Sequence, residues 1–346
     1  MASPTVNAQK DIMLTQNWAM PTLANPAATG DIDYIRIRGG ARLESLGIYH
    51  SPKNFLGTAD APFKLLGKRI GAGVIINSES YFLYRNLMVG AQGSYKMNIR
   101  KSRLSIGIQL GYYHSKFKGS ELTLADLGGN EPDDNETPGE EIPDLETFAD
   151  TDTDIDSGNQ GGNNGSYSDD ELPTQDVKAG TVDFSVGVRY EHPFFYVGVA
   201  GHHLTNPTLK LTTEGNSSTD SRYLEYKIPA SLYFDAGGNI PIPNSLFTLQ
   251  PSLQIATDFS DFTSVIEMRS TYNQRVTFGV DYRWNKAVGV MAGFSLKNFF
   301  IGYAWEYDYT ASAKRSTGNH ELVLGYQFKL DMSGKSLFSH RSIRIM

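Results

Sequence analysis

Long segments in which apolar and polar residues alternate constrain the fold of this chain more than any other feature. In the stretch RLSIGIQLGYYHSKF, which begins at Arg103, the even-numbered residues 104–112 are all apolar and the odd-numbered residues 103–111 are polar or glycine. Side chains of a β-strand point alternately to its two faces, so this segment has one apolar and one polar face. The pattern recurs in residues 87–100, 182–191, 224–235, 276–284, 299–308 and 321–329.

The apolar face of such strands has two possible surroundings. In a soluble sheet it packs on a core, whereas in a closed membrane sheet it meets lipid and the polar face lines a lumen. A lipid-spanning strand needs roughly 9 to 11 residues, which is the length of these segments, and charges fall repeatedly on the polar face. We therefore expect an all-β transmembrane antiparallel β-barrel of about 12 to 14 strands, with 14 as the best estimate, over residues 31–332. A large soluble all-β protein is the alternative.

Composition excludes several other classes of protein. The chain has 346 residues and no cysteine, so it contains no disulfide, no thiolate nucleophile and no Cys-ligated metal. No apolar run approaches the roughly 18 residues of a membrane helix. The 19 tyrosines and 18 phenylalanines gather near the predicted strand ends, as in YFLYR and WEYDY, where the aromatic girdles of a membrane barrel lie.

Acidic residues are concentrated in one insertion. Residues 119–177 contain 18 Asp and Glu and no Lys, Arg or His, which leaves 31 basic and 20 acidic residues in the rest of the chain. The insertion is rich in Pro, Gly, Asn and Asp, and this composition is typical of a solvated loop. It follows the fifth predicted strand, and long barrel loops lie outside the cell. We therefore expect a long acidic extracellular loop and no nucleic-acid partner.

The acidic loop contains the one candidate metal site. Asp150, Asp152, Asp154 and Asp156 stand at alternate positions, and carboxylates at this spacing can converge on Ca²⁺. The match to an EF-hand is poor, because the sixth position counted from Asp152 is not Gly and the twelfth is not Glu. Diffuse collection of divalent ions by a polyelectrolyte loop is the alternative, and we expect no other cofactor.

Charged residues on the polar faces define the predicted lumen. If Ile35 and Ile37 face lipid, neighbouring arginines point inward together with charges of later strands. These charges line either a path for a ligand or peptide, or a network of ion pairs that fills the barrel, and we favour the network. The predicted lumen charges are Arg36, Arg38, Arg42, Arg103, Arg189, Arg283, Asp183, Glu191, Asp281, Glu306, Asp308 and Glu321.

Catalytic arrangements find little support in the sequence. His202 and His203 are adjacent, so on a strand they would point to opposite faces and could not chelate one metal. Ser115 and His114 are separated in the same way. We therefore expect no catalytic residues and no enzyme, with an outer-membrane hydrolase as the enzymatic alternative.

The two ends of the chain carry separate predictions. Residues 1–8 look like the tail of a signal peptide for the Sec pathway, with small residues at Val6 and Ala8 and cleavage after Ala8. Residues 9–30 form a periplasmic segment or a plug. In this segment Trp18, Met20 and Leu23 either dock on a partner at the periplasmic mouth or fill the barrel. Residues 333–346 form a basic C-terminal tail.

Several motifs in a fixed order resemble one known family. They are LTQNWAMPTLANPAATG at 14–30, YHSP at 49–52, RIGAGVIINSES at 69–80, HHLTNPTLKL at 202–211, then IGYAWEYDYT, GNHELVLGYQF and the closing RSIRIM. Together they are similar to the PorP/SprF family of outer-membrane proteins of the Bacteroidota type IX secretion system. The chain departs from the family pattern in its long acidic insertion and in ending on Met346 rather than on an aromatic residue.

The resemblance implies a role in protein secretion and gliding motility. A protein of this family is expected in the outer membrane, surrounded by lipid, where it docks or anchors adhesin-like cargo at the cell surface. The cargo carries a type IX C-terminal domain, and the protein contacts the periplasmic lipoprotein ring of the system. A passive pore or small-molecule transporter is the alternative function.

Overall fold

The computed structural model describes residues 12–48, 50–65, 67–122, 175–211, 224–310 and 316–330, and the backbone strand Thr5–Asn7. Most of the acidic insertion, the proposed cleavage site after Ala8, the four candidate Ca²⁺ ligands Asp150, Asp152, Asp154 and Asp156, and the basic tail 333–346 lie outside the described residues.

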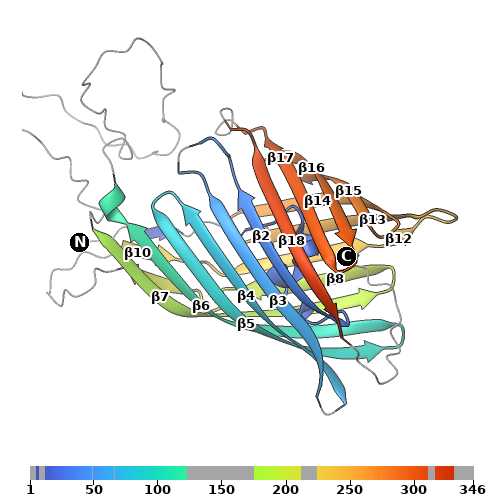
Figure 1. Ribbon diagram of the computed structural model, residues 1–346. Coiled ribbons are helices and arrows are strands. Elements are labelled where there is room, and N and C mark those ends of the chain that lie inside the picture. The colour runs from blue at the N-terminus through green and yellow to red at the C-terminus, as the bar shows by residue number, and fades with distance from the viewer. Residues whose placement is uncertain are drawn as a thin grey trace, which may run out of the picture.

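Fourteen antiparallel strands of the described residues close into a barrel (Figure 1). Each strand pairs with its neighbours in the chain, β11 pairs with β13, and the last strand β18 pairs with the first wall strand β2. The prediction of 12 to 14 strands is therefore confirmed. The wall strands are β2 (Tyr34–Leu43), β3 (Lys53–Leu65), β4 (Lys68–Tyr81), β5 (Tyr84–Ile99), β6 (Ser102–Lys118), β7 (Asp176–His192), β8 (Phe195–His202), β11 (Ser231–Gly238), β13 (Phe247–Thr257), β14 (Phe262–Tyr272), β15 (Val276–Arg283), β16 (Ala287–Leu296), β17 (Phe299–Asp308) and β18 (Asn319–Lys329).

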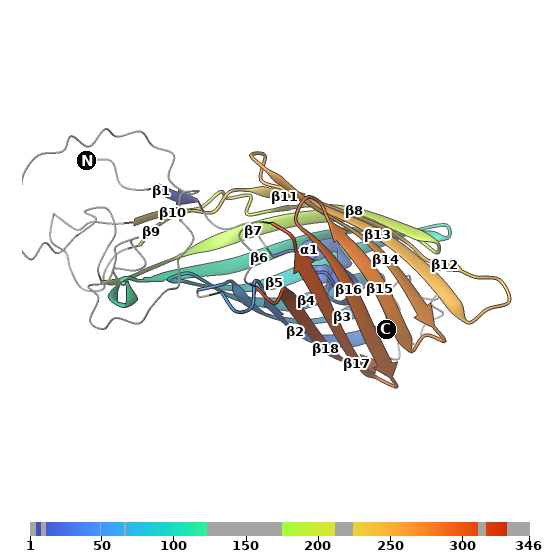
Figure 2. The ribbon, with the colours of Figure 1, turned by 90° about the horizontal axis from the view of Figure 1, so that it is seen from above.

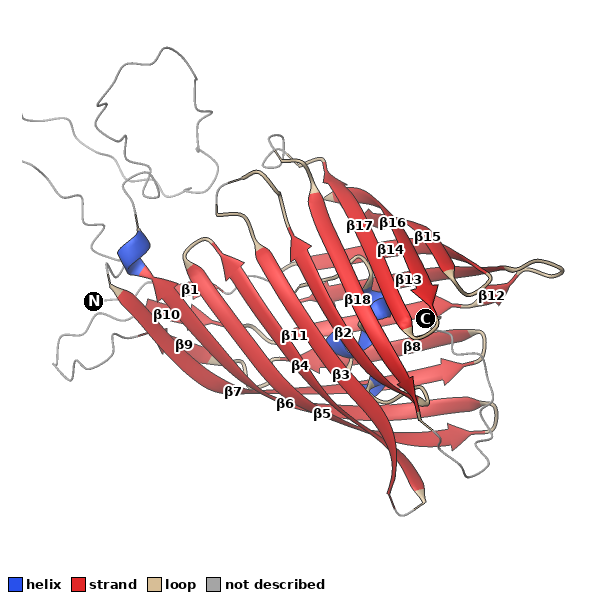
Figure 3. Ribbon diagram, in the orientation of Figure 1, coloured by secondary structure: helices blue, strands red, loops and turns tan. Residues whose placement is uncertain are grey.

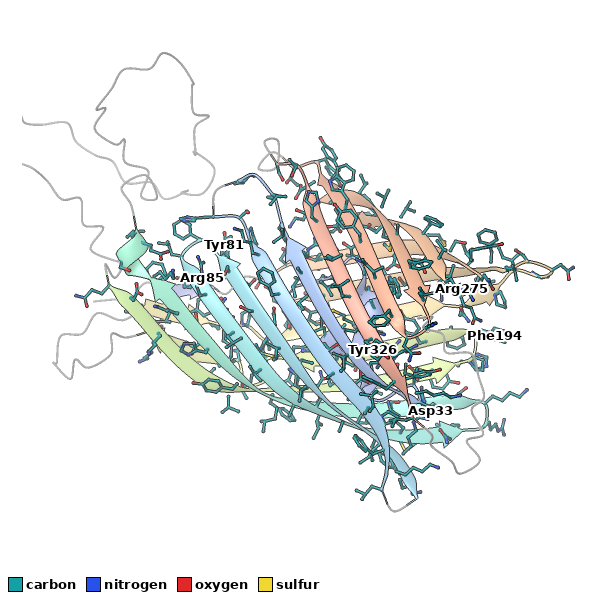
Figure 4. All side chains as sticks on the ribbon, viewed as in Figure 1. Asp33, Tyr81, Arg85, Phe194, Arg275 and Tyr326 are labelled. Atoms are coloured by element: carbon teal, nitrogen blue, oxygen red, sulfur yellow. The ribbon has the colours of Figure 1, made fainter. Side chains whose placement is uncertain are left out.

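The apolar faces of the strands point away from the barrel axis. On β6, Ile108 and Leu110 are 54% and 61% exposed, whereas Ser105 and Gln109 are at most 1% exposed. Large apolar side chains cover the outer surface in the same way on the other strands (Figure 4). Because a soluble sheet would bury this face, the wall has the polarity of a membrane barrel, with its apolar surface turned outward.

The two ends of the barrel differ in the length of their connections. At one end, which we call the short-turn end, most turns are short, such as 100–101, 193–194 and 297–298. The other end, the long-loop end, carries the connections after β2, β6, β8 and β17, including the acidic insertion after the fifth wall strand (Figure 1). β7 begins at Asp176, so the last two residues of the predicted insertion belong to a strand. In Figure 4, Tyr81 and Arg85 mark the long-loop end and Asp33 and Phe194 mark the short-turn end.

Three short helical turns of the N-terminal segment lie inside the barrel, where Figure 3 shows them in blue. They are η1 (Asn17–Ala19), α1 (Pro21–Ala24) and η2 (Pro26–Ala28). Pro21 and Pro26 each occupy the first position of a turn, where the missing N–H costs nothing. Pro26 also prevents α1 from continuing, because a proline disfavours the α conformation in the residue before it. The helices of the described residues are all this short, and none has the length and apolarity of a bilayer-spanning helix.

A second, small sheet sits at the long-loop end (Figure 2). The hairpin of β9 (Thr208–Leu211) and β10 (Leu224–Lys227) belongs to the connection after β8, and β1 (Thr5–Asn7) pairs in parallel with β10. Leu209, Leu211 and Tyr226 of the hairpin pack on Tyr113 and Phe117 of β6. The remaining short elements are η3 (Gly119–Glu121) and β12 (Ile240–Pro241), and β12 pairs antiparallel with β13.

Candidate functional site: the plug and the barrel lumen

Residues 12–30, which we call the plug, fill the middle of the barrel and contact the inner faces of strands all round it. Trp18 and Met20 are 6% and 1% exposed, and Leu23 is half-buried. The three residues predicted to dock on a partner therefore lie within the barrel. The front half of the plug (residues 12–20) and its rear half (residues 25–30) are held by different kinds of contact.

The front half is anchored by a network of charges around Glu306 of β17. The Arg42 Nη2 lies 2.5 Å from one carboxylate oxygen of Glu306, and the Arg283 Nη2 lies 3.0 Å from the other. Arg42 also reaches Glu321 of β18 at 3.2 Å. All four side chains are at most 5% exposed, so each charge depends on its partners for the stabilisation that water would otherwise give.

This network binds the plug backbone directly. The N–H groups of Thr15 and Gln16 donate to the Glu321 carboxylate at 2.9 and 2.7 Å, and the Thr15 hydroxyl donates to Glu306 at 2.7 Å. The Arg283 guanidinium donates to the Met13 carbonyl at 3.0 Å. The carboxylates thus satisfy at once the buried arginines and the backbone of the plug, which has no sheet of its own to supply hydrogen bonds.

An apolar and aromatic cluster completes the front half. Trp18 meets the Phe300 ring edge to face with centroids 5.1 Å apart, and the Arg269 guanidinium lies 4.3 Å from the Trp18 ring centroid. Leu14, Trp18, Ala19 and Met20 pack with Leu56, Phe300 and Val323 of the wall. This cluster is one of the small apolar cores inside the barrel, and a second one is formed by Met13 with Ala200, Tyr233, Ala256 and Val265.

The rear half is held mainly through its backbone. The Asn25 Oδ1 accepts the Ala27 N–H at 2.9 Å and so caps η2, while its Nδ2 donates to the Val188 carbonyl of β7 at 3.2 Å. Lys96 donates to the Ala27 carbonyl at 3.2 Å, and the Ser94 hydroxyl donates to the Thr29 carbonyl at 2.7 Å. The segment carries no charge of its own, and hydrogen bonds run in both directions between it and the wall.

Inward-facing glycines make room for the rear half. A Cβ added at Gly107 of β6 would lie 2.3 Å from the Ala27 nitrogen, and one at Gly187 of β7 would lie 2.1 Å from the Asn25 Oδ1. One at Gly71 of β4 would lie 2.0 Å from the Thr29 carbonyl oxygen. Real Cβ atoms do not approach this closely, so any side chain at these positions would displace the plug.

A second charge network closes the short-turn end of the lumen. Arg36 pairs with Asp31 at 2.8 Å and Asp60 at 2.7 Å, and the Gly30 N–H donates to Asp60 at 2.6 Å. Arg103 pairs with Glu191, which also accepts from Arg189. The plug therefore leaves the barrel between paired charges, and β2 begins four residues after Gly30.

All the predicted lumen charges point inward. Arg103 and Glu191 keep 13% and 12% side-chain exposure, and the others in the following group are at most 6% exposed. They are Arg36, Arg38, Arg42, Arg189, Arg283, Asp183, Asp281, Glu306, Asp308 and Glu321. Asp308 accepts hydrogen bonds from Thr310.

The two adjacent histidines do not point to opposite faces, so this part of the prediction was wrong. His202 and His203 are 5% and 4% exposed and both lie inside, because β8 ends at His202 and His203 adopts a φ of 53°, which turns the chain. The ring of His202 contacts the Ala24 carbonyl at 3.0 Å, and the Nδ1 of His203 lies 3.0 Å from Asp183. Among the described residues, no group of three or more Asp, Glu and His side chains is arranged to hold a metal ion.

Sequence reasoning missed several residues that hold the plug. Asp60, Lys96 and Asn25 were not predicted to contact the plug or to belong to it. Asp60 occupies an inward position of β3, and Lys96 occupies an inward position of β5. The available signal was the NPA tripeptide at 25–27, since Asn before Pro is a strong helix-capping pattern.

The closed wall, the charged lumen and the internal plug together define a plugged β-barrel membrane protein. A family model described as type IX secretion system membrane protein PorP/SprF matches residues 6–326. The chain belongs to this family, as its motifs indicated. It is thus a type IX secretion system membrane protein with an outer-membrane barrel fold.

Solved structures with similar folds are distant in sequence. The toluene transporter TodX of Pseudomonas putida is 12% identical with 89% of this chain and 93% of that chain covered and a TM-score of 0.44. The monoaromatic hydrocarbon channel CymD is 11% identical over 89% and 91%, with a TM-score of 0.46. Omp33 of Acinetobacter baumannii is 6% identical over 86% and 99%, with a TM-score of 0.42. No curated protein sequence matches the chain.

Proposed function

We propose that the protein is an outer-membrane docking component of the type IX secretion and gliding machinery, and that it anchors adhesin-like cargo at the cell surface without catalysing a reaction. The observation that carries this proposal is the plug. A barrel whose lumen is filled by its own chain, and whose plug is held by two charge networks, is suited to a static binding role.

The difference between the two ends of the barrel indicates how it is oriented in the membrane. Long loops of outer-membrane barrels face the exterior and short turns face the periplasm. The long-loop end, with the β9–β10 hairpin and the acidic insertion, is then the surface on which secreted cargo with a type IX C-terminal domain is held. The short-turn end faces the periplasmic lipoprotein ring, and export to this location follows the Sec route.

Affinity purification from native membranes tests the proposal. The tagged protein should recover secreted cargo and ring lipoproteins in amounts that survive washing in detergent. A matched preparation of an unrelated outer-membrane barrel of the same cells controls for non-specific recovery. Recovery of the bare barrel, with neither class of partner above this control, would contradict the docking role.

The alternative function is a passive pore or small-molecule transporter. A pore requires a continuous aqueous path, and the buried plug with its backbone bonds to opposite walls argues against one. A pore should give steady conductance in a planar bilayer, whereas a dock should be silent.

A further inference from the structure

A cavity of about 460 Å³ opens at the long-loop end of the barrel, within the size range of small-ligand sites. Its floor is the start of the plug, Ile12 and Met13, and its walls are the ends of the strands β3, β4, β11, β13 and β14 with the connections beyond them. We call this cavity the vestibule. It lies at the end marked by Tyr81 and Arg85 in Figure 4.

The charges that line the vestibule favour a cationic ligand. Four carboxylates, those of Glu44, Glu79, Asp258 and Asp261, face two cations, Arg283 and Lys286. Arg283 is committed to Glu306 and to the Met13 carbonyl. Lys286 is 45% exposed and its Nζ lies 3.8 Å from Glu44, a weak surface pair. Glu44 is paired with Arg42 at 3.0 Å, and Glu79 accepts a hydrogen bond from the neutral Asn86 amide at 3.1 Å. The carboxylates outnumber the cations among the lining residues.

Glu44 keeps its charge at neutral pH. Burial would raise the pKa of this carboxyl, but the nearby Arg42, Lys286 and Arg283 outweigh burial and lower it. Glu44 lies just beyond β2, at the edge of the vestibule. Glu44 thus contributes a negative charge at this edge of the cavity at neutral pH.

A buried acceptor points to a hydrogen-bond donor in the ligand. Asn54 lines the vestibule and is 2% exposed, and its Oδ1 has no hydrogen-bond partner. Leaving a buried polar atom unpaired costs free energy, and a ligand N–H would recover this cost. Asn54 stands directly opposite Glu79 in the pairing of β3 with β4, so an amide oxygen and a carboxylate lie side by side on one wall.

The facing wall offers an apolar surface beside the polar side chains of Ser231, Thr257 and Thr263. Ile228, Pro229, Tyr233 and Ala256 line it, and Met13 continues the apolar surface across the floor. We propose that the vestibule binds an organic cation with a guanidinium or primary ammonium head and an apolar body. The head lies between Asn54 and Glu79, and the body rests on Tyr233 and Met13. An arginine or lysine side chain of a polypeptide and a free alkylguanidine share this chemistry.

Binding of matched peptides to the full-length protein in detergent tests the site. The probe is N-acetyl-Leu-Arg-Leu-amide, its neutral isostere carries citrulline in place of arginine, and a third peptide carries glutamate. Calorimetry should show saturable binding of the arginine peptide, at least about tenfold weaker binding of the citrulline peptide, a loss of about 1.4 kcal/mol, and no binding of the glutamate peptide. Equal binding of the arginine and citrulline peptides, or no saturable binding, would overturn the proposal.

Two further arms identify the source of the cation and the residues that bind it. Butylguanidine alone reports whether a free cation suffices. If it binds as tightly as the peptide, the ligand is a free amine or guanidine; if it binds much more weakly, the ligand is a polypeptide.

Glu79→Gln should weaken arginine-peptide binding about tenfold, whereas Glu121→Gln, an exposed carboxylate that does not line the cavity, should leave it unchanged. Equal affinities of the two variants would remove Glu79 from the site, and the selectivity of the unmodified protein for arginine over citrulline would still decide the proposal. The proposed site does not rest on the cargo-anchoring role. Peptide binding and recovery of cargo are measured separately, so either proposal can fail without the other.

Discussion

The front and rear halves of the plug are held in the same barrel by different means. The front half depends on side-chain charge, because Glu306 and Glu321 bind both its backbone and two buried arginines. The rear half carries no charge and depends mainly on shape, because its backbone fits against Gly71, Gly107 and Gly187, while Arg36, Lys96 and Asp60 of the wall bond only its backbone groups. We therefore expect the front half to be sensitive to removal of one charge and the rear half to be sensitive to addition of a side chain at one of these glycines.

The largest effect is expected from a side chain at the rear. Gly107→Leu places atoms where the Ala27 backbone lies, so the rear half cannot seat. Ala28 is fully buried, and because the chain has no cysteine, an Ala28→Cys background gives a single reporter. Maleimide labelling of Cys at position 28 should accelerate more than tenfold in the Gly107→Leu protein.

Gly93→Leu is the matched control for this experiment. Gly93 faces outward on β5, and an added Cβ there meets its nearest atom at 4.0 Å. Labelling should stay slow in this variant. Fast labelling in both variants would mean that the plug is not held by the glycine surface.

A smaller effect is expected from loss of one charge at the front. Glu306→Gln keeps the size and shape of the side chain but removes the negative charge that pairs with Arg42 and Arg283. Breaking a buried ion pair costs about 3–5 kcal/mol. Urea unfolding followed by tryptophan fluorescence should show a loss of this size. Glu121→Gln, which removes an exposed carboxylate, should change the free energy of unfolding by less than about 1 kcal/mol. Equal losses would contradict the role of charge in the front half.

The cap of the rear half should contribute less. Asn25→Ala removes the bond from the Ala27 N–H and the bond to the Val188 carbonyl, and we expect a loss of about 1–2 kcal/mol. Hydrogen exchange should accelerate at Ala27 and Ala28 while protection at Thr15 and Gln16 is kept. Acceleration over the whole plug would show that the halves are not independent; the exposed Asn98→Ala serves as the control.

The smallest effect is the pH dependence of the free energy of unfolding that Glu44 contributes at the long-loop end. The pKa of Glu44 is lower in the folded protein than its ordinary value of 4.5. Its stabilising contribution is therefore present above about pH 4.5 and is lost as the pH falls through the lowered pKa. Glu44→Gln should reduce stability slightly at neutral pH, and the difference from the unmodified protein should vanish in acid. A difference that persists at low pH would contradict this account.

Much of the wall was predictable because the alternation of a strand is a property of its backbone. The outward positions of Ile106 and Ile108 and the inward positions of Arg36 and Arg42 follow from parity alone. The partners of these arginines do not. Glu321 stands opposite Arg42 only because β18 closes on β2 in a particular register, and register between the first and last strands is set by the whole barrel.

The fit of the plug was not predictable for a different reason. A glycine at an inward position of a strand is equally consistent with a bulge, a bend or a close approach of another segment. The close approach becomes visible only when Ala27 and Thr29 are placed beside Gly107 and Gly71. Trp18 and Met20 had the composition of either a docking segment or a plug, and composition alone does not choose between the two.

Conductance across a planar bilayer tests the central claim, that the chain closes its own lumen, most directly. The unmodified protein should be silent, and a variant that lacks residues 12–30 should conduct steadily. Steady conductance by the unmodified protein, at the level of the deletion variant, would contradict the claim that the plug fills the barrel.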